Sequence, residues 1–199
     1  MKNKITEKTL SKNEISEIYK KYAKYDFPKD ELKTLTHILN LYNKNIYLGK
    51  GFLADNELKS YMFFAMSEKY RECALLDFFA VNPVCRNNGF GSLSIDMIKN
   101  TIPFKNGIIA EIEDPKYSKT DKEKTIRKKR ASFYEKNSFI KTNITSVCFG
   151  VHFLIIYLPL KKENILSDNE IKNILNDIYK SIFSKYDFEN NISIDITSS

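Results

Sequence analysis

The chain contains few of the residues from which disulfide frameworks and zinc sites are built. Its 199 residues include three cysteines, Cys73, Cys85 and Cys148, and two histidines. The cysteines are odd in number and widely spaced, and none belongs to a Cys-x-x-Cys pair. This pattern supports neither a disulfide framework nor a zinc site. We therefore expect a chain with reduced thiols and no metal cofactor.

Long hydrophobic runs are also absent. The longest run, Val147–Leu160, is too short to span a bilayer and is interrupted by Gly150 and His152. The first ten residues are polar and lack the apolar core of a signal peptide. We expect a cytoplasmic protein that does not insert into a membrane.

The charge is moderately basic, because 32 Lys and Arg residues against 25 Asp and Glu residues give a net charge of +7. Such a balance suits nucleic acid or a polyanionic cofactor. Eight of the basic residues fall between 116 and 130, but Asp121 and Glu123 lie among them and Tyr117 is the only aromatic residue there. Since nucleic-acid grooves interleave aromatic and basic side chains, we expect a solvated loop leading into a helix and no nucleic-acid partner. The alternative is that some of these side chains meet the phosphates of a cofactor or an anionic substrate.

Hydrophobic periodicity divides the chain into helices and strands. Helices are predicted over 5–25, 30–42 and 168–183, with capping boxes at Ser11 and Glu14 and at Ser167 and Glu170. Strands are predicted over 46–53, 58–66, 75–81 and 107–113, and 147–160 is predicted to form a closing hairpin or one long strand. The tail from Tyr186 is rich in Asn and Ser and is predicted to be loose.

The stretch from Leu75 to Ile98 has the parts of a phosphate-binding cradle. A buried strand ends at Asn82-Pro83, the loop Arg86-Asn87-Asn88-Gly89-Phe90-Gly91-Ser92 follows, and a helix is predicted after it. The N–H groups at a helix N-terminus lack intrahelical partners and attract anions, and glycine lets the backbone approach a ligand closely. The Rossmann and P-loop patterns, Gly-x-Gly-x-x-Gly and Gly-Lys-Ser/Thr, do not occur.

Two motifs in order resemble the GNAT superfamily of acyl-CoA-dependent N-acyltransferases. The first is Arg-x-x-Gly-x-Gly after a strand, and the second is the helix end Phe133-Tyr134-Glu135-Lys136-Asn137-Ser138-Phe139. Ser138 stands where the family pattern has glycine, so we expect Asn137 to take the left-handed conformation. Arg127 and Arg130 stand where such families often have Asn and Ala, which puts the usual amide contact to pantetheine in question.

The resemblance implies an α/β fold with a mixed, mostly antiparallel central sheet of six or seven strands and helices on both faces. It covers 46–160. We expect one acyltransferase domain over 1–160, with 1–45 as a helical substrate-side segment. The C-terminal helix and tail, 161–199, are expected to pack on the same domain.

The resemblance also implies N-acetyl transfer from acetyl-CoA to a primary amine by direct attack in a ternary complex. Tyr134 would be the general acid toward the leaving thiolate. The coenzyme would be held by the end of the central strand, by the cradle loop and by Asn137. In full, the implied coenzyme-binding residues are Phe79, Ala80, Val81, Arg86, Asn87, Asn88, Gly89, Phe90, Gly91, Ser92 and Asn137.

Two carboxylates are candidates for substrate binding or general-base catalysis. Asp77 interrupts an apolar strand, which is costly unless it faces a wet cleft or a partner. Glu111 and Glu113 share one face of the next strand. The alternative for each is a structural carboxylate paired with a basic residue. Acidic side chains in the cleft would favour a cationic amine substrate, and a monomer or homodimer is expected. A non-catalytic acyl-CoA-binding or sensing module on the same fold, and more remotely a nucleic-acid-binding protein, are the other function classes.

Overall fold

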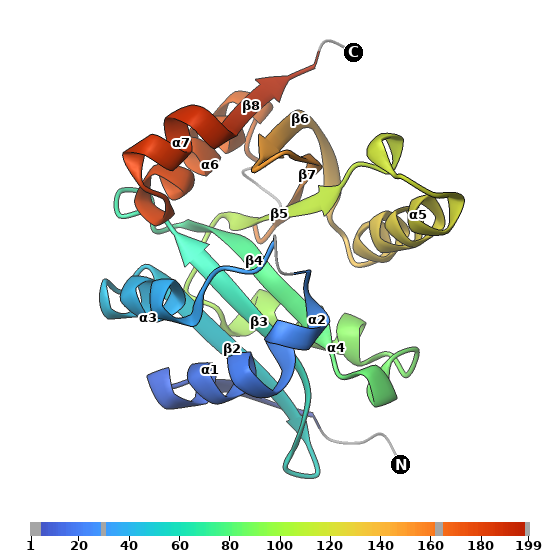
Figure 1. Ribbon diagram of the computed structural model, residues 1–199. Coiled ribbons are helices and arrows are strands. Elements are labelled where there is room, and N and C mark those ends of the chain that lie inside the picture. The colour runs from blue at the N-terminus through green and yellow to red at the C-terminus, as the bar shows by residue number, and fades with distance from the viewer. Residues whose placement is uncertain (1–4, 29–30, 162–164, 198–199) are drawn as a thin grey trace. The chain divides into compact units, whose positions relative to one another are not determined.

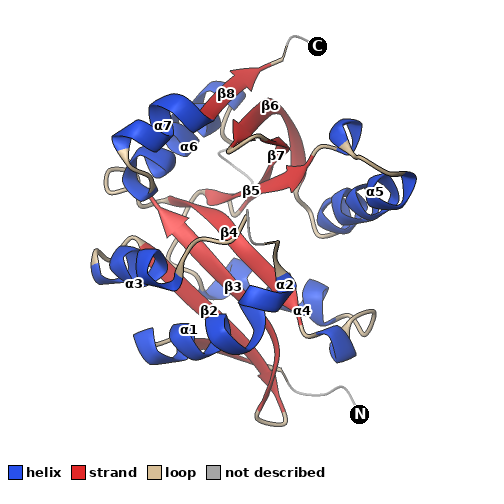
Figure 2. Ribbon diagram, viewed as in Figure 1, coloured by secondary structure: helices blue, strands red, loops and turns tan. Residues whose placement is uncertain are grey.

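The structure is a computed structural model that describes residues 5–28, 31–161 and 165–197. It divides into two compact units. Unit 1 comprises Met1–Ala65 and Asp77–Ile102, and unit 2 comprises Met66–Leu76 and Pro103–Ser199. The elements are labelled in Figure 1 and coloured by type in Figure 2. Each unit is described by itself.

The sheet of unit 1 is an antiparallel ladder of β1 (Thr6–Thr9), β2 (Tyr47–Ala54) and β3 (Glu57–Met66). A tight turn joins β2 to β3, with Asp55 and Asn56 at φ 53° and 63°. Two consecutive positive φ values suit a two-residue hairpin loop, which is why Asp and Asn stand there. The second half of β4 (Cys73–Val81) also belongs to this unit, and its end is fixed where the N–H of Asn82 donates to the carbonyl of Lys59 at 2.8 Å.

The helices of unit 1 are α1 (Lys12–Ile18), α2 (Lys24–Asp26), α3 (Leu35–Asn43) and α4 (Phe90–Thr101). A π-helical turn, Tyr19–Ala23, joins α1 to α2. The predicted capping box of Ser11 and Glu14 starts α1. The cradle motif ends at α4, which buries Ile95 and Ile98.

Unit 2 is built on the first half of β4, which pairs in parallel with β5 (Gly107–Glu113). From β5 the sheet continues antiparallel through β7 (Val151–Pro159), β6 (Ile140–Cys148) and β8 (Ile192–Ile196). Its helices are α5 (Asp121–Lys136), α6 (Asp168–Ile182) and α7 (Lys185–Asn191). The predicted capping box of Ser167 and Glu170 starts α6.

Over the described residues the strand order is β1-β2-β3-β4-β5-β7-β6-β8, in which β4 and β5 pair in parallel. This confirms the predicted α/β class with a mixed, mostly antiparallel sheet. The sheet has eight strands rather than six or seven. For 147–160, predicted to be a closing hairpin or one long strand, the structure has the hairpin, because Phe149 and Gly150 form the turn between the end of β6 and β7 at φ 49° and 80°.

Four predictions about local structure are wrong. Thr6–Thr9 is a strand rather than the start of a helix, and it is held to β2 by its ladder bonds and by the ion pair between Glu7 and Lys50. The second helix begins at Leu35 rather than near Asp30, because the Thr34 hydroxyl caps it by accepting from the N–H of His37. Residues 29–30, within the predicted start, lie outside the described residues.

The tail from Tyr186, predicted to be loose, contains most of α7 and all of β8. A strand forms there because Ile192, Ile194 and Ile196 alternate with polar residues, and Ile194 is buried. The prediction for Asn137 is also wrong, since its φ is −98° and Ser138 takes the left-handed position at 72°. The side chain of Asn137 instead donates to the carbonyl of Phe133 at 2.7 Å.

Candidate functional site

The cradle loop lies in unit 1, between the end of β4 and the start of α4. Pro83–Cys85 forms a single 3-10 turn, capped by the Asn82 side chain. Asn87 and Gly89 then take positive φ values of 65° and 80°. A Cβ atom at Gly89 would meet nothing within 4 Å, so the backbone conformation, rather than space, is what favours glycine there.

The N-terminus of α4 has no side-chain cap. Its N-cap residue is Gly89, whereas α1, α3, α5, α6 and α7 begin with a Ser or Thr hydroxyl that accepts a backbone N–H. The first N–H groups of a helix have no intrahelical acceptor and carry partial positive charge. The start of α4 therefore keeps the donors that an anion such as a pyrophosphate needs.

Arg86 opens this loop and braces it. Its Nε donates to the carbonyl of Val81 at 3.2 Å, and its Nη2 lies 3.5 Å from Oδ1 of Asp26. The other oxygen of Asp26 accepts from the hydroxyl of Tyr61 at 2.8 Å. Burial is the main reason why the pKa of Tyr61 is raised, so this phenol stays a donor. Arg86 thus ties the end of β4 to α2, while about half of its side chain stays exposed.

Asp77 is the polar interruption in β4, and the structure gives it two partners within unit 1. Its Oδ1 accepts from Nζ of Lys33 at 2.6 Å, and its Oδ2 accepts from the hydroxyl of Tyr47 at 2.5 Å. The side chains of Asp77 and Lys33 are 6% and 14% exposed. Burial, then the Asp77 charge, raises the pKa of Tyr47 well above its ordinary value, so this phenol stays protonated. Both carboxylate oxygens are therefore engaged.

The remaining residues predicted on the central strand follow Asp77 in unit 1. Phe79 and Val81 are partly exposed, while Ala80, between them, is buried. This is the alternation of a strand with one open face. The structure thus brings Asp77, the end of β4 and the whole cradle loop into one unit.

Tyr134 lies in unit 2 on the last turn of α5. Its ring packs edge-on against Phe133 and Phe139, with centroids 5.4 and 5.0 Å away. Burial raises the pKa of Tyr134 to about 12, against a smaller opposing effect of Arg130. Among the residues that the structure describes, none gives the Tyr134 hydroxyl a hydrogen bond. The phenol is thus protonated at neutral pH and its proton is not committed to an internal acceptor.

Glu111 also lies in unit 2, on β5. Its Oε1 accepts from the hydroxyl of Ser146 on β6 at 2.9 Å and from the hydroxyl of Tyr179 on α6. Tyr179 is 1% exposed, and burial, then the Glu111 charge, raises its pKa well above the ordinary value. Glu111 therefore anchors the C-terminal helix to the sheet of this unit.

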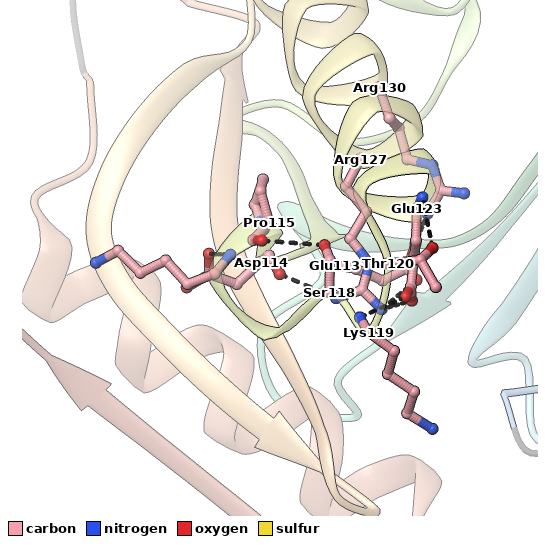
Figure 3. A network of polar contacts seen from close by, with 10 residues as sticks. Glu113, Asp114, Pro115, Ser118, Lys119, Thr120, Glu123, Arg127 and Arg130 are labelled. Atoms are coloured by element: carbon pink, nitrogen blue, oxygen red, sulfur yellow. Dashed lines mark hydrogen bonds and ion pairs between the residues drawn. The ribbon is translucent and has the colours of Figure 1, made fainter.

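Two arginines of the basic segment before Tyr134 form ion pairs with nearby carboxylates (Figure 3). Nη2 of Arg127 lies 2.5 Å from Glu123 and 3.2 Å from Glu113, and Nη1 donates to the carbonyl of Asp114 at 2.9 Å. Arg130 pairs with the second oxygen of Glu113. Arg127 is 9% exposed, and its Nε has no hydrogen-bond partner among the described residues. These two arginines are thus committed to carboxylates of the same unit.

Sequence reasoning missed four partners in these clusters, namely Lys33, Tyr47, Asp26 and Tyr179. The sequence held a signal for only some of these partners. The lone Asp77 in an apolar strand indicates that a cation or hydrogen-bond donor must lie beside it, but does not identify the residue. Within the described part of the chain, no three His, Cys, Asp or Glu side chains are grouped so that they could hold a metal ion. No described helix is both long enough and apolar enough to cross a membrane.

Comparison with solved structures shows the fold. A protein assigned to the GNAT family of acetyltransferases, from Bacteroides thetaiotaomicron, superposes with a TM-score of 0.67 and 15% identity, over 87% of this chain and 96% of its own. Dodecameric spermidine N-acetyltransferase from Vibrio cholerae superposes with a TM-score of 0.57 and 13% identity, over 80% and 95%. The ribosomal-protein-S18-alanine N-acetyltransferase from Escherichia coli gives 0.53 and 16%, over 82% and 99%.

No family model matches the sequence, and no curated protein matches it. The structural likeness nevertheless spans nearly the whole length of each neighbour. The chain therefore has the GNAT acyltransferase fold, as the two sequence motifs predicted.

Proposed function

We propose that this chain is an N-acetyltransferase that uses acetyl-CoA as co-substrate and a primary amine as acceptor. One observation carries the proposal. In a chain with the GNAT fold, the helix that follows β4 begins without a side-chain cap, behind a loop with positive φ at Asn87 and Gly89. This is the backbone arrangement that binds a pyrophosphate, and it lies at the motif that predicted it.

On unit 1 we assign the coenzyme contacts. The main chain of Phe79, Ala80 and Val81 would bind the acyl-pantetheine arm, and the loop from Arg86 to Ser92 would bind the pyrophosphate. The loop N–H groups are the main donors in this assignment. The Arg86 guanidinium would act chiefly by holding the loop, because it already bonds to Val81 and Asp26.

On unit 2 we assign the proton donor. The amine nitrogen attacks the thioester carbonyl carbon, the C–S bond breaks, and the leaving thiolate takes the proton of Tyr134 while the amine loses one to water. A pKa of about 12 keeps Tyr134 protonated before transfer. Proton donors of this kind contribute roughly 10²- to 10⁴-fold to rate. Asn137 remains a proposed coenzyme contact through its backbone, because its amide already caps α5.

For Asp77 and Glu111 we favour roles in binding and structure over that of a free base. Each carboxylate accepts two hydrogen bonds from buried or half-buried partners of its own unit, so both are already held in place. The acceptor amine would therefore lose its proton to solvent.

The second candidate function is a non-catalytic acyl-CoA-binding or sensing module on the same fold. It is favoured by Arg127 and Arg130, which are tied to Glu113 and Glu123 at positions where such families often carry Asn and Ala. Replacing Tyr134 by Phe separates the two functions. The enzyme should lose at least about tenfold in kcat, whereas the sensing module would show no activity to lose.

We further propose that 1–160 acts as one acyltransferase domain, with 161–199 as its C-terminal addition, in a monomer or homodimer. A cytoplasmic location suits the three cysteines, since the thiols of cytosolic proteins stay reduced. We propose neither a nucleic-acid nor a membrane partner.

The first test is a thermal shift with acetyl-CoA, desulfo-CoA and ATP. A ligand that binds only the folded state at about 100 times its Kd stabilises it by roughly 2.7 kcal/mol. Shifts with both coenzyme forms but not with ATP would support the cradle, and thiol release with a panel of amines would then test transfer. Absence of a shift with every coenzyme form would refute both candidate functions.

A further inference from the structure

We propose that Asp77 and Tyr47 form a subsite for a primary alkylammonium group, and that the side chain of Lys33 occupies this subsite in the present structure. As part of an acceptor site, the proposal rests on the proposed function. As a cation site, it stands on contacts within unit 1 alone.

The surroundings of the Lys33 ammonium are those of an alkylammonium receptor. Asp77 accepts from Nζ at 2.6 Å, and the same carboxylate is oriented by the hydroxyl of Tyr47 at 2.5 Å. The ring of Phe78 lies below, with its centroid 5.5 Å from Nζ. A carboxylate beside an aromatic face binds organic cations through charge and cation–π attraction. Tyr47 is 3% exposed, so the site is largely desolvated.

A buried lysine elsewhere in the same unit, Lys50, shows what a structural ion pair looks like. Lys50 lies on β2 directly opposite Thr9 of β1, donates to its hydroxyl at 2.9 Å and pairs with Glu7 of the same strand. That pair fixes the register of two strands. Lys33 instead lies in a stretch that belongs to no helix or strand, just before the Thr34 cap of α3.

A ligand ammonium could exchange with the Lys33 ammonium without leaving Asp77 unpaired, which is the costly outcome for a buried charge. A buried ion pair adds little net stability, because desolvation offsets the attraction between the charges. A ligand ammonium that replaced Nζ would regain the same contacts with Asp77. Lys33 thus acts as a tethered competitor that lowers the apparent affinity for the ligand.

The charge of the bound group limits what the ligand is. An ammonium held by Asp77 is protonated and is no nucleophile. A substrate that used this subsite would need a second, neutral amine to receive the acetyl group. The class indicated is a diamine or polyamine rather than a monoamine.

Chemical rescue tests the subsite without any turnover. Lys33→Ala removes three methylenes and the ammonium, which n-propylammonium replaces atom for atom. We expect n-propylammonium chloride to raise the Tm of this variant by about 3 °C or more above an equal concentration of tetramethylammonium chloride. In the double variant Lys33→Ala, Asp77→Asn the difference should vanish. The proposal would be overturned if the two salts gave the same Tm in the single variant, or if their Tm difference were equal in the single and double variants.

A measurement on the wild-type chain remains decisive if the alanine variant does not fold. Saturating 1,3-diaminopropane should speed backbone hydrogen exchange over 31–35, because the Lys33 side chain loses its anchor. Unchanged exchange would contradict the proposal.

Kinetics give the matched control. Lys33→Met should lower the KM for 1,3-diaminopropane several-fold with kcat little changed, while Lys50→Met should alter neither. An unchanged or raised KM in Lys33→Met would also count against the subsite. The acetyl-CoA thermal shift separates the two proposals. The absence of that shift would refute the proposed function, and the propylammonium rescue would still test the cation site independently.

Discussion

The hydrogen bond from Tyr179 to Glu111 can be removed almost without changing the shape of either residue. Tyr179→Phe deletes only the hydroxyl that reaches the carboxylate from α6, at a position 1% exposed. A hydrogen bond to a charged group is worth about 1.5–3 kcal/mol. For a chain of this size 1 kcal/mol corresponds to about 2–4 °C, so a loss of about 2 kcal/mol should lower the Tm by about 4–8 °C. Thermal unfolding followed by circular dichroism would measure the fall in Tm, and urea unfolding would measure the loss of free energy.

A double-mutant cycle shows whether Glu111 anchors α6 or acts as a base. If it is an anchor, Tyr179→Phe and Glu111→Gln should couple by about 1–2 kcal/mol, and Glu111→Gln should keep kcat within about tenfold. A base would lose about 10²- to 10⁴-fold. Tyr186→Phe, at a side chain that is 72% exposed, should change neither the free energy of unfolding nor kcat. Wild-type stability in Tyr179→Phe would refute the anchor.

Three further outcomes are expected. Gly89→Ala should cost about 1–2 kcal/mol and weaken the acetyl-CoA thermal shift, whereas Gly150→Ala, also at φ 80°, should cost the same and leave the shift intact. Arg127→Met should destabilise by about 3–5 kcal/mol in urea, and Arg130→Met, 45% exposed, by less than about 1 kcal/mol. Alkaline pH should unfold the chain, because burial raises the pKa of five tyrosines, to about 12 for Tyr134. These tyrosines ionise in the unfolded chain before they do in the folded one. Above about pH 10, the free energy of unfolding should therefore fall by about 1.4 kcal/mol per pH unit for each of them, from the value that it has below pH 10. A fold that persists at pH 12 in a circular-dichroism titration would contradict this. The five are Tyr47, Tyr61, Tyr134, Tyr157 and Tyr179.

The elements that could be predicted from the sequence are those whose cause is local. Ser11 with Glu14, and Ser167 with Glu170, satisfy helix N–H groups within one turn, and both capping boxes form as expected. Thr6–Thr9 could not be predicted in this way, because its four polar residues show no apolar alternation. Its ladder with β2 and the Glu7 pair with Lys50 come from residues more than 40 positions away.

In the candidate site, too, local features could be predicted from the sequence and tertiary contacts could not. The cradle loop is contiguous, so its turn residues and the start of α4 were readable from Gly89 and its neighbours. The surroundings of Asp77 were not, because Lys33 lies 44 positions before it in an irregular segment. A strand pattern shows that a buried carboxylate needs a partner, but the tertiary fold alone chooses which residue supplies it.

The two carboxylates that the sequence offered for proton abstraction, Asp77 and Glu111, are engaged, as is Glu113 beside them, and this has a kinetic consequence. Asp77 is held by Lys33 and Tyr47, Glu111 by Tyr179, and Glu113 by two arginines. With no free base among them, the neutral fraction of the acceptor amine sets the rate. We expect log(kcat/KM) to rise with unit slope up to the pKa of the acceptor itself. Two acceptors whose pKa values differ by about two units should then show breaks about two pH units apart, measured by thiol release below pH 9.5, where the five buried tyrosines are neutral. A break at one pH for both acceptors would show that a group of the protein removes the proton.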